Sequence, residues 1–226
     1  ITLFVIGLLI LASASMALAE KNFGHPGYYI MRQMVLGGAV GLAFFFIGQY
    51  VPYRLWRMAS MPLMAIAFIS LALVFIPQIG FSAGGAVRWL RFGGFVFQPA
   101  ELMKLAFVIY LAAWLDARRK DVSSIAYGVA PFAVMLGIMS IFLIMQPDIG
   151  TWIIIMVSSG LLYYLGGGKI SQMATLFGLG LILLFLVIQI SPYRSNRLQV
   201  FLNPQLDPQG IGYQINQAHI AIGSGG

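Results

Sequence analysis

The stretch Ala126-Tyr-Gly-Val-Ala-Pro-Phe-Ala-Val-Met-Leu-Gly-Ile-Met-Ser-Ile-Phe-Leu-Ile-Met145 decides the fold, because it holds twenty residues without a single charge. A helix of about 20 mostly apolar residues is long enough to cross the hydrocarbon core of a bilayer. A second apolar stretch, Thr151–Leu165, follows after only five residues. Two such stretches with so short a connection predict neighbouring helices of a membrane protein.

The same pattern continues outward on both sides of this pair. Five more apolar stretches occupy Ile1–Leu18, Met31–Tyr50, Met58–Ile76, Pro99–Trp114 and Met173–Ile190. We therefore predict an all-α fold, a polytopic bundle of about seven transmembrane helices joined by short loops.

The composition agrees with a bilayer as the natural solvent. Of the 226 residues, 60% are hydrophobic and 8% are charged, whereas soluble domains have about 25% charged residues. The hydrophobicity excludes disorder, which needs few apolar residues and many charges. The chain has no cysteine, which excludes a disulfide scaffold and a thiolate metal site.

The net charge of +7 comes from 13 basic and 6 acidic residues. In a membrane protein, basic residues flank the spans and contact anionic headgroups, so we predict no nucleic-acid partner. The scarcity of acids is more useful. Six acids and two histidines are nearly the whole inventory for acid–base chemistry.

The connections predict an orientation in the membrane. Three of them, 51–57, 115–124 and 166–169, are short and basic, and the positive-inside rule favours such loops as cytoplasmic. Segments 19–27, 77–98 and 191–226 then lie outside the cytoplasm. The chain starts inside hydrophobic sequence and stops after an amphipathic run. We interpret residues 1–226 as a single integral membrane domain truncated at both ends; Ala17-Leu18-Ala19 leaves a signal peptide as the alternative.

Two similar sequences open apolar stretches from the outer side, Gln98-Pro99-Ala100-Glu101 and Gln146-Pro147-Asp148. Proline at the first helical position and an acid in the first turn are ordinary helix-start chemistry, so Glu101 and Asp148 either stabilise helix starts or take part in the site. Lys104 lies three residues after Glu101, on the same helix face. It either pairs locally with Glu101 or lines a polar cavity.

The loop 77–98 contains Arg88-Trp89-Leu90-Arg91 among several glycines. Trp89 suits the membrane interface. Arg88 and Arg91 are candidates for binding a phosphorylated headgroup, because guanidinium matches phosphate oxygens bidentately.

The last loop, 191–226, contains Arg194, Arg197, Asp207 and Gln214. After Pro208, one helical stripe is apolar and predicts a helix lying on the membrane surface; it comprises Ile211, Ile215, Ala218 and Ile222. In the sequence Asp-Pro-x-Gly, Asp207 either caps a turn or acts in chemistry.

Several motifs occur in order along the chain: Ser13-Ala14-Ser15, Tyr29 with Arg32-Gln33, Ile76–Gly80 leading to Gly85–Trp89, Gln98–Leu105, Gln146–Thr151, and Asn203-Pro204-x-x-Asp207-Pro208-x-Gly210-x-Gly212-Tyr213-Gln214 running into Ala221–Gly226. Their order and spacing resemble the SEDS family (shape, elongation, division and sporulation), whose members include FtsW, RodA and SpoVE. Tyr213-Gln214 is more typical of FtsW-like chains. Ala100 stands where the family usually has serine. The family typically has ten spans, so about seven spans here imply a part that is inactive alone.

The resemblance implies a peptidoglycan glycosyltransferase that polymerises lipid II, the undecaprenyl-pyrophosphate-linked disaccharide-pentapeptide, during cell division or cell-wall elongation. Asp207 matches the family's essential loop aspartate and would be the general base. Fixed cations would stabilise the leaving pyrophosphate. The candidate substrate-binding residues are Arg88, Trp89, Arg91, Glu101, Lys104, Asp148, Arg194, Arg197 and Gln214. The sequence requires no cofactor and identifies no metal ligands, although a divalent cation could contribute.

The resemblance also implies a multi-pass protein of the bacterial inner membrane with its catalytic loop extracytoplasmic. Its expected partners are a class B penicillin-binding protein transpeptidase and other membrane proteins of the divisome or elongasome. Two alternatives stay open, a lipid II flippase and a scaffold that recruits a transpeptidase. A transporter concentrates polar residues near the midplane, whereas here they cluster at the outer ends of spans, which favours surface catalysis.

Overall fold

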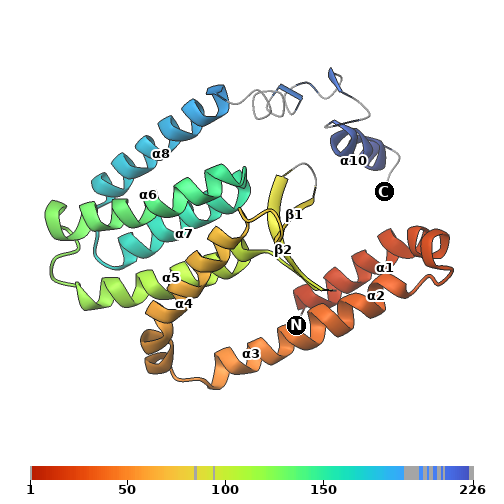
Figure 1. Ribbon diagram of the computed structural model, residues 1–226, viewed down its shortest axis with the longest axis horizontal. Coiled ribbons are helices and arrows are strands. Elements are labelled where there is room, and N and C mark those ends of the chain that lie inside the picture. Colours follow the sequence, from red (N-terminus) through yellow and green to blue (C-terminus); the bar gives the residue numbers. More distant parts are fainter. Residues whose placement is uncertain are drawn as a thin grey trace. The chain divides into compact units, whose positions relative to one another are not determined.

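The computed structural model describes residues 2–83, 86–93, 95–190, 199–200, 203, 206–207, 210 and 212–223. The chain divides into two compact units, Ile1–Met58 and Ala59–Gly226. Each unit is described by itself below (Figure 1).

The first unit is a pair of helices. Helix α1 (Thr2–Phe23) ends at Gly24, whose φ of 65° is the left-handed conformation that terminates many helices. The chain then runs through α2 (Tyr28–Arg32), the π-helix η1 (Gln33–Ala39) and α3 (Val40–Tyr50). Gly38 of η1 faces Phe4 of α1 so closely that an added Cβ would lie 3.2 Å from the Phe4 ring. The two helical stretches therefore pack together.

The second unit is a helical bundle. Its helices are α4 (Tyr53–Leu73), α5 (Pro99–Ala117), the π-helix η2 (Ile125–Val129) continuing into α6 (Ala130–Met145), α7 (Ile149–Leu165), α8 (Ile170–Ile190) and α10 (Tyr213–Gly223). Most of α4 belongs to this unit. Figure 1 shows α4 to α7 side by side, with α5 in contact with α7.

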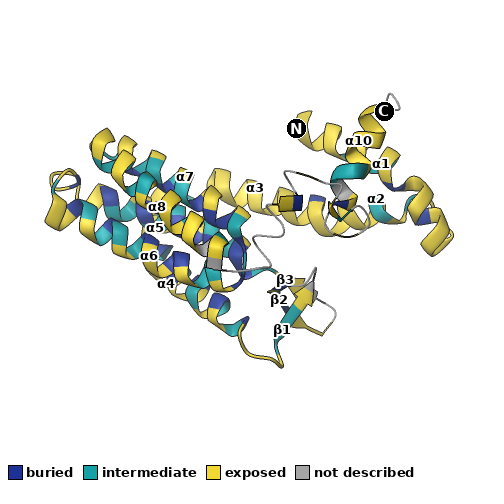
Figure 2. Ribbon diagram, turned by 90° about the horizontal axis from the view of Figure 1, so that it is seen from above, coloured by how far each residue is buried: buried dark blue, intermediate teal, exposed yellow. Residues whose placement is uncertain are grey.

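The core of the second unit follows one face of α5. Its buried side chains recur every four residues at Met103, Phe107, Leu111 and Leu115, which is the period of one helix face. Partners come from α4, α6 and α7. Figure 2 shows the buried residues concentrated on α4 to α7, and exposed residues prevailing on α1 and α3.

The packing and composition are those of helices in a membrane. In lipid, close approach of small residues drives helix association, and the core contains the small buried residues Ala67, Ala100, Ala106, Ser140 and Ser159. Within the described residues, four helices are long and apolar enough to cross a membrane: Thr2–Phe23, Tyr28–Tyr50, Tyr53–Leu73 and Ile125–Met145. Shorter apolar helices cover Ile149–Leu165 and Ile170–Leu186. The predicted polytopic helical fold is confirmed.

A small antiparallel sheet accompanies the helices of the second unit. Strands β1 (Gly80–Ala83), β2 (Ala86–Phe92) and β3 (Phe95–Phe97) pair in the order β1-β2-β3 within the predicted loop 77–98. We call the end of the bundle that carries them the sheet end. Two-residue connections rich in glycine are typical of hairpins, and Gly84-Gly85 and Gly93-Gly94 separate the strands in sequence. The segment 77–98, interpreted above as a loop between two spans, therefore carries a sheet.

Each of the seven predicted apolar stretches coincides with a helix among the described residues, but several boundaries differ. Helix α1 runs on to Phe23, five residues past the predicted end, and α4 starts at Tyr53 rather than Met58. The reason is that helices continue into polar and basic flanks such as Arg54 and Arg57, where hydropathy no longer marks them. In the last loop, α10 coincides with much of the helix expected after Pro208; its place on the membrane surface stays a prediction.

At the end of the bundle opposite the sheet, two connections are held together by hydrogen bonds. The Tyr163 hydroxyl donates to the Val122 carbonyl oxygen at 2.7 Å, and the Gln172 Nε2 donates to the Ser123 carbonyl oxygen at 2.8 Å. The Tyr163 ring also stacks on Phe132, with centroids 4.6 Å apart. The α5–η2 and α7–α8 connections are thereby fixed to one another.

Candidate active site

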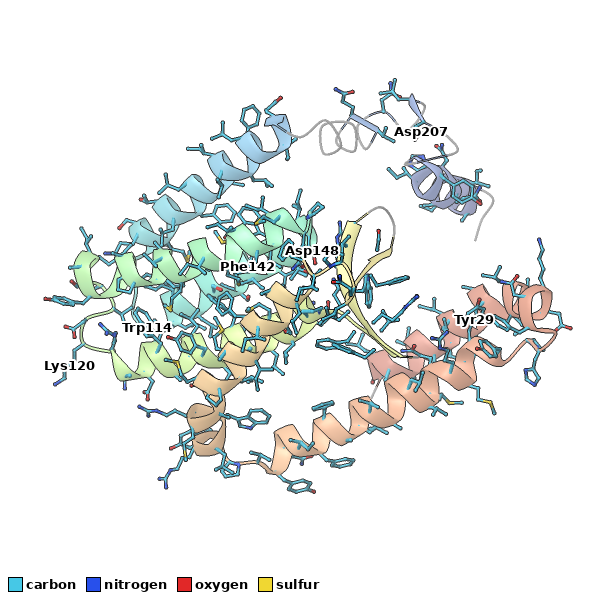
Figure 3. The ribbon with its side chains drawn as sticks, in the orientation of Figure 1. Tyr29, Trp114, Lys120, Phe142, Asp148 and Asp207 are labelled. Carbon is cyan, nitrogen blue, oxygen red and sulfur yellow. The ribbon has the colours of Figure 1, made fainter. Side chains whose placement is uncertain are left out.

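The two Gln-Pro sequences meet at the sheet end. Gln98 precedes α5, and its Nε2 donates to the Asp148 Oδ2 at 3.2 Å. Asp148 is the N-cap of α7, where its Oδ1 accepts from the Thr151 backbone N–H at 3.2 Å. Asp148 is buried and lies at the start of α7 near the sheet (Figure 3). Its carboxylate therefore joins the beginnings of α5 and α7, and its contacts are those of a capping residue.

Arg88 fixes the sheet to the same junction. From β2, its Nε donates to the Gln146 carbonyl oxygen at 3.0 Å and its Nη2 donates to the Pro147 carbonyl oxygen at 2.6 Å. These two carbonyl groups directly follow the C-terminal end of α6. The last carbonyl groups of a helix have no partner within the helix, and the helix dipole makes this end favourable for a cation. Two nitrogen atoms of the Arg88 guanidinium, Nε and Nη2, thus donate hydrogen bonds to backbone carbonyl oxygens. The phosphate-binding role expected for Arg88 stays a prediction.

Gln146 is a structural member of this junction that the sequence interpretation did not single out. Its side chain is buried, and its Nε2 donates to the Leu71 carbonyl oxygen at 3.1 Å. Its Oε1 is buried without a hydrogen-bond partner among the described residues. The sequence contained one indication of this role, the repeated Gln-Pro pair. It indicated that both glutamine side chains lie near helix starts, but not which groups they contact.

Glu101 and Lys104 form the local ion pair that their spacing allows. The Lys104 Nζ lies 2.9 Å from the Glu101 Oε1, and the side chains are 27% and 58% exposed respectively. The pair sits in the first two turns of α5, beside the junction of Gln98 and Asp148. Lys104, a partly exposed cation near a helix start, is available to an anionic ligand, because a solvent-exposed ion pair stabilises a protein by only about 0–1 kcal/mol.

Trp89 and Arg91 lie on β2, on either side of the buried Leu90. Trp89 is half-buried and pairs in register with Phe81 of β1. The exposed Arg91 guanidinium lies over the Phe81 ring, 3.7 Å from its centroid. This cation–π contact holds the side chain against the sheet.

Asp207 lies in a separate turn that leads into α10 (Figure 3). Its Oδ1 accepts from the Gly210 backbone N–H at 3.0 Å, and its carbonyl oxygen accepts from the Gly212 N–H at 3.0 Å. The side chain is half-buried. The structure therefore contains the turn-capping contact that Asp-Pro-x-Gly suggests, and that contact holds the carboxylate in one place.

Some predicted site residues cannot be placed. Arg194 and Arg197 lie outside the described residues, and so does the side chain of Gln214, whose backbone belongs to α10. In the described part of the chain, no group of three or more histidine or acidic side chains is arranged to hold a metal ion.

The structure thus brings Arg88, Gln98 and Asp148 into one hydrogen-bonded junction, places the Glu101–Lys104 pair beside it, and holds Asp207 in its own turn. Chemically, it offers a fixed carboxylate as a proton acceptor and cations for an anionic group. Asp148 is buried and both of its carboxylate oxygens accept hydrogen bonds, whereas Asp207 is only half-buried, so Asp207 is the better candidate base.

We expect Arg88→Ala to lower the free energy of unfolding by about 1–3 kcal/mol, because two carbonyl oxygens lose a charged donor. Arg91→Ala is the matched control from the same strand, and its exposed cation–π contact predicts a loss of about 0.5–1 kcal/mol. Denaturation of the purified protein in mixed detergent micelles, followed by circular dichroism, measures both. Equal losses for the two variants would contradict the anchoring role of Arg88.

Comparison with known proteins gives a consistent result. The family model FTSW_RODA_SPOVE, described as "Cell cycle protein", matches residues 1–226. The chain is 34% identical over 223 residues to the probable peptidoglycan glycosyltransferase FtsW of Trichlorobacter lovleyi, covering 97% of this chain and 58% of that protein. It is 37% identical over 227 residues to the stage V sporulation protein E of Bacillus subtilis, covering 99% of this chain and 61% of that protein.

Solved structures agree with the sequence matches. A chain from "Structural coordination of polymerization and crosslinking by a peptidoglycan synthase complex" superposes with a TM-score of 0.70 at 31% identity, covering 97% of this chain and 65% of that one. The rod shape determining protein RodA of Thermus thermophilus superposes with a TM-score of 0.58 at 29% identity, covering 78% and 58%. The chain therefore spans less than two thirds of each of these proteins.

Proposed function

This chain belongs to the FtsW/RodA/SpoVE family of cell cycle proteins, and from that membership we propose that it carries the catalytic aspartate of a lipid II polymerase, a peptidoglycan glycosyltransferase. The observation that carries the proposal is the fixed carboxylate of Asp207, at the position that matches the family's loop aspartate. A relative named as a probable peptidoglycan glycosyltransferase, matched over 97% of this chain, supports the reaction class.

The proposed reaction joins two lipid-linked glycans. A sugar hydroxyl of one lipid II attacks the anomeric carbon at the reducing end of the other glycan. The bond from that carbon to the undecaprenyl pyrophosphate oxygen breaks, and the pyrophosphate leaves with the bonding electron pair. Asp207 takes the hydroxyl proton as the new bond forms, a contribution typically worth about 10²–10⁴-fold in rate.

Cations supply the second part of the mechanism. The leaving pyrophosphate gains negative charge, so positive groups fixed near it stabilise the transition state. Lys104 is partly exposed beside Glu101, and Arg91 is exposed on the sheet. Both are proposed to bind the pyrophosphate, together with Arg88, Arg194 and Arg197. Trp89, Glu101, Asp148 and Gln214 complete the proposed substrate-binding set. A divalent cation would act in the same sense as the arginines.

The cellular setting is also part of the proposal. A multi-pass membrane protein acting on lipid II would lie in the bacterial inner membrane with the sheet end and the Asp207 turn extracytoplasmic. A class B penicillin-binding protein is the proposed transpeptidase partner, within a divisome or elongasome. The likeness to a chain from a peptidoglycan synthase complex supports partnership with a cross-linking enzyme.

The test is polymerisation of purified lipid II by the full-length protein, with and without its transpeptidase partner, with glycan products resolved on a gel. Glycan strands support the polymerase. Translocation of labelled lipid II across reconstituted vesicles without polymer formation would identify a flippase instead. If neither activity appears with or without the partner although the two proteins bind each other, the scaffold alternative replaces the proposal.

A further inference from the structure

We infer that Gly210 is a positioning residue for Asp207, because the space where its side chain would stand is occupied by the Asp207 carboxylate. The inference rests on the proposed role of Asp207 as the base. It adds a second residue to that function, one that acts through another residue and does not touch the reacting atoms.

The contact between Gly210 and Asp207 has two parts. The Gly210 N–H donates to the Asp207 Oδ1 at 3.0 Å. A Cβ added at Gly210 would lie 2.6 Å from that oxygen and 2.7 Å from the Asp207 Cγ, and would overlap the Oδ2 as well. Real Cβ atoms essentially never lie closer than 3.0 Å to another heavy atom. Any other residue at position 210 therefore displaces either the carboxylate or the backbone.

Backbone conformation does not explain the glycine. The glycines with a left-handed φ in the described chain are Gly24, Gly93 and Gly167, and Gly210 is not among them. Its φ is one that other residues adopt readily. The close approach of the carboxylate is therefore the physical reason for glycine at this position.

Backbone hydrogen bonds connect Asp207 and Gly210 to the residues that lead into α10. Gly212 donates its N–H to the Asp207 carbonyl oxygen at 3.0 Å, and Tyr213 donates its N–H to the Gly210 carbonyl oxygen at 3.1 Å. Asn216 then donates to the Gly212 carbonyl oxygen at 2.9 Å as α10 begins. Because these bonds hold the main chain at Gly210, Gly212 and Tyr213, and the obstacle is the end of a side chain, the easier response to an added methyl group is rotation of the Asp207 side chain.

The consequence for catalysis is large even though the displacement is small. A shift of about 1 Å in a catalytic group can cost about 10²-fold in rate. We therefore expect Gly210→Ala to lower kcat for lipid II polymerisation by about 10²-fold, with KM within about twofold of the wild type.

The experiment compares Gly210→Ala, Asp207→Asn and Gly178→Ala in the full-length protein with its transpeptidase partner. Gly178 of α8 has nothing within 4 Å of an added Cβ, so Gly178→Ala should polymerise at the wild-type rate. If Asp207→Asn is inactive and Gly210→Ala is fully active, the inference fails and the proposed function stands. If Asp207→Asn is itself fully active, the proposed role of Asp207 fails first.

A stability cycle tests the inference without using activity. Gly210→Ala is compared with the wild type, and Asp207→Ala/Gly210→Ala with Asp207→Ala, by thermal unfolding in detergent. Removing the carboxylate removes the obstacle, so any fall in Tm caused by Gly210→Ala should disappear in the Asp207→Ala background. A fall of equal size in both backgrounds would show that the turn itself requires glycine, which would overturn the inference.

Discussion

Asp207→Asn in the full-length protein is expected to abolish glycan polymerisation while leaving the fold unchanged. The amide has nearly the same shape as the carboxylate, and its oxygen can still accept from the Gly210 N–H. It cannot take a proton from the acceptor hydroxyl at neutral pH. The rate should fall by at least the contribution of general base catalysis, about 10²–10⁴-fold.

The measurement is the rate of lipid II polymerisation, with binding of lipid II and thermal unfolding measured on the same preparations. Asp121→Asn is the matched control, because it makes the same chemical change at an exposed acid in the α5–η2 connection, opposite the sheet end. Binding and Tm should stay at wild-type values for both variants. Polymerisation at the normal rate by Asp207→Asn would remove Asp207 from the mechanism.

Gly128→Ala should produce the largest loss of stability from a single methyl group, about 3 kcal/mol, at the upper end of what overpacking costs. An added Cβ would overlap the Val122 carbonyl oxygen and lie 2.8 Å from the Asp121 carbonyl oxygen. Both obstacles are backbone and cannot rotate away. The Val122 carbonyl also accepts from the Tyr163 hydroxyl, so moving it would weaken the link between the α5–η2 and α7–α8 connections.

Gly137→Ala in the same helical stretch is the control, since nothing lies within 4 Å of its added Cβ. Alanine is the better helix former by about 1 kcal/mol, so this variant should be neutral or slightly stabilised. Denaturation in mixed micelles measures the difference between the two. A Gly128→Ala protein as stable as Gly137→Ala would contradict the close packing against Val122.

The sequence predicted the helices well because their signal is local. Twenty uncharged, mostly apolar residues at Ala126–Met145 suffice to indicate a span, and the structure has helix over Ile125–Met145. The sheet was missed for the opposite reason. Its short strands depend on pairing between Gly80–Ala83, Ala86–Phe92 and Phe95–Phe97, and such pairing between separate segments leaves no local signal as strong as a long apolar run.

In the candidate site, too, local contacts could be predicted from the sequence and long-range contacts could not. The spacing of Glu101 and Lys104 was enough to predict that they could pair, since both lie on one helix face. The bond between Gln98 and Asp148 joins residues fifty positions apart, and the bonds from Arg88 reach residues 58 and 59 positions away. Such partners follow from tertiary packing, which no local pattern contains.

The sheet also indicates how deep the protein sits in the bilayer. In the order β1-β2-β3, each outer strand pairs within the sheet on one side only, and hydrocarbon cannot satisfy the remaining backbone groups. The sheet must therefore lie at the level of the headgroups or in a polar recess. Because β3 ends at Phe97 and α5 starts at Pro99, Lys104 lies only about 8 Å along α5 from its start at 1.5 Å per residue.

At that distance from the helix start, the Lys104 ammonium group can reach water along its own aliphatic stem. In the proposed reaction, a lipid-linked pyrophosphate would meet this cation at the boundary of the bilayer, with its prenyl chain still dissolved in lipid. The growing glycan could then leave through water without any sugar entering the hydrocarbon.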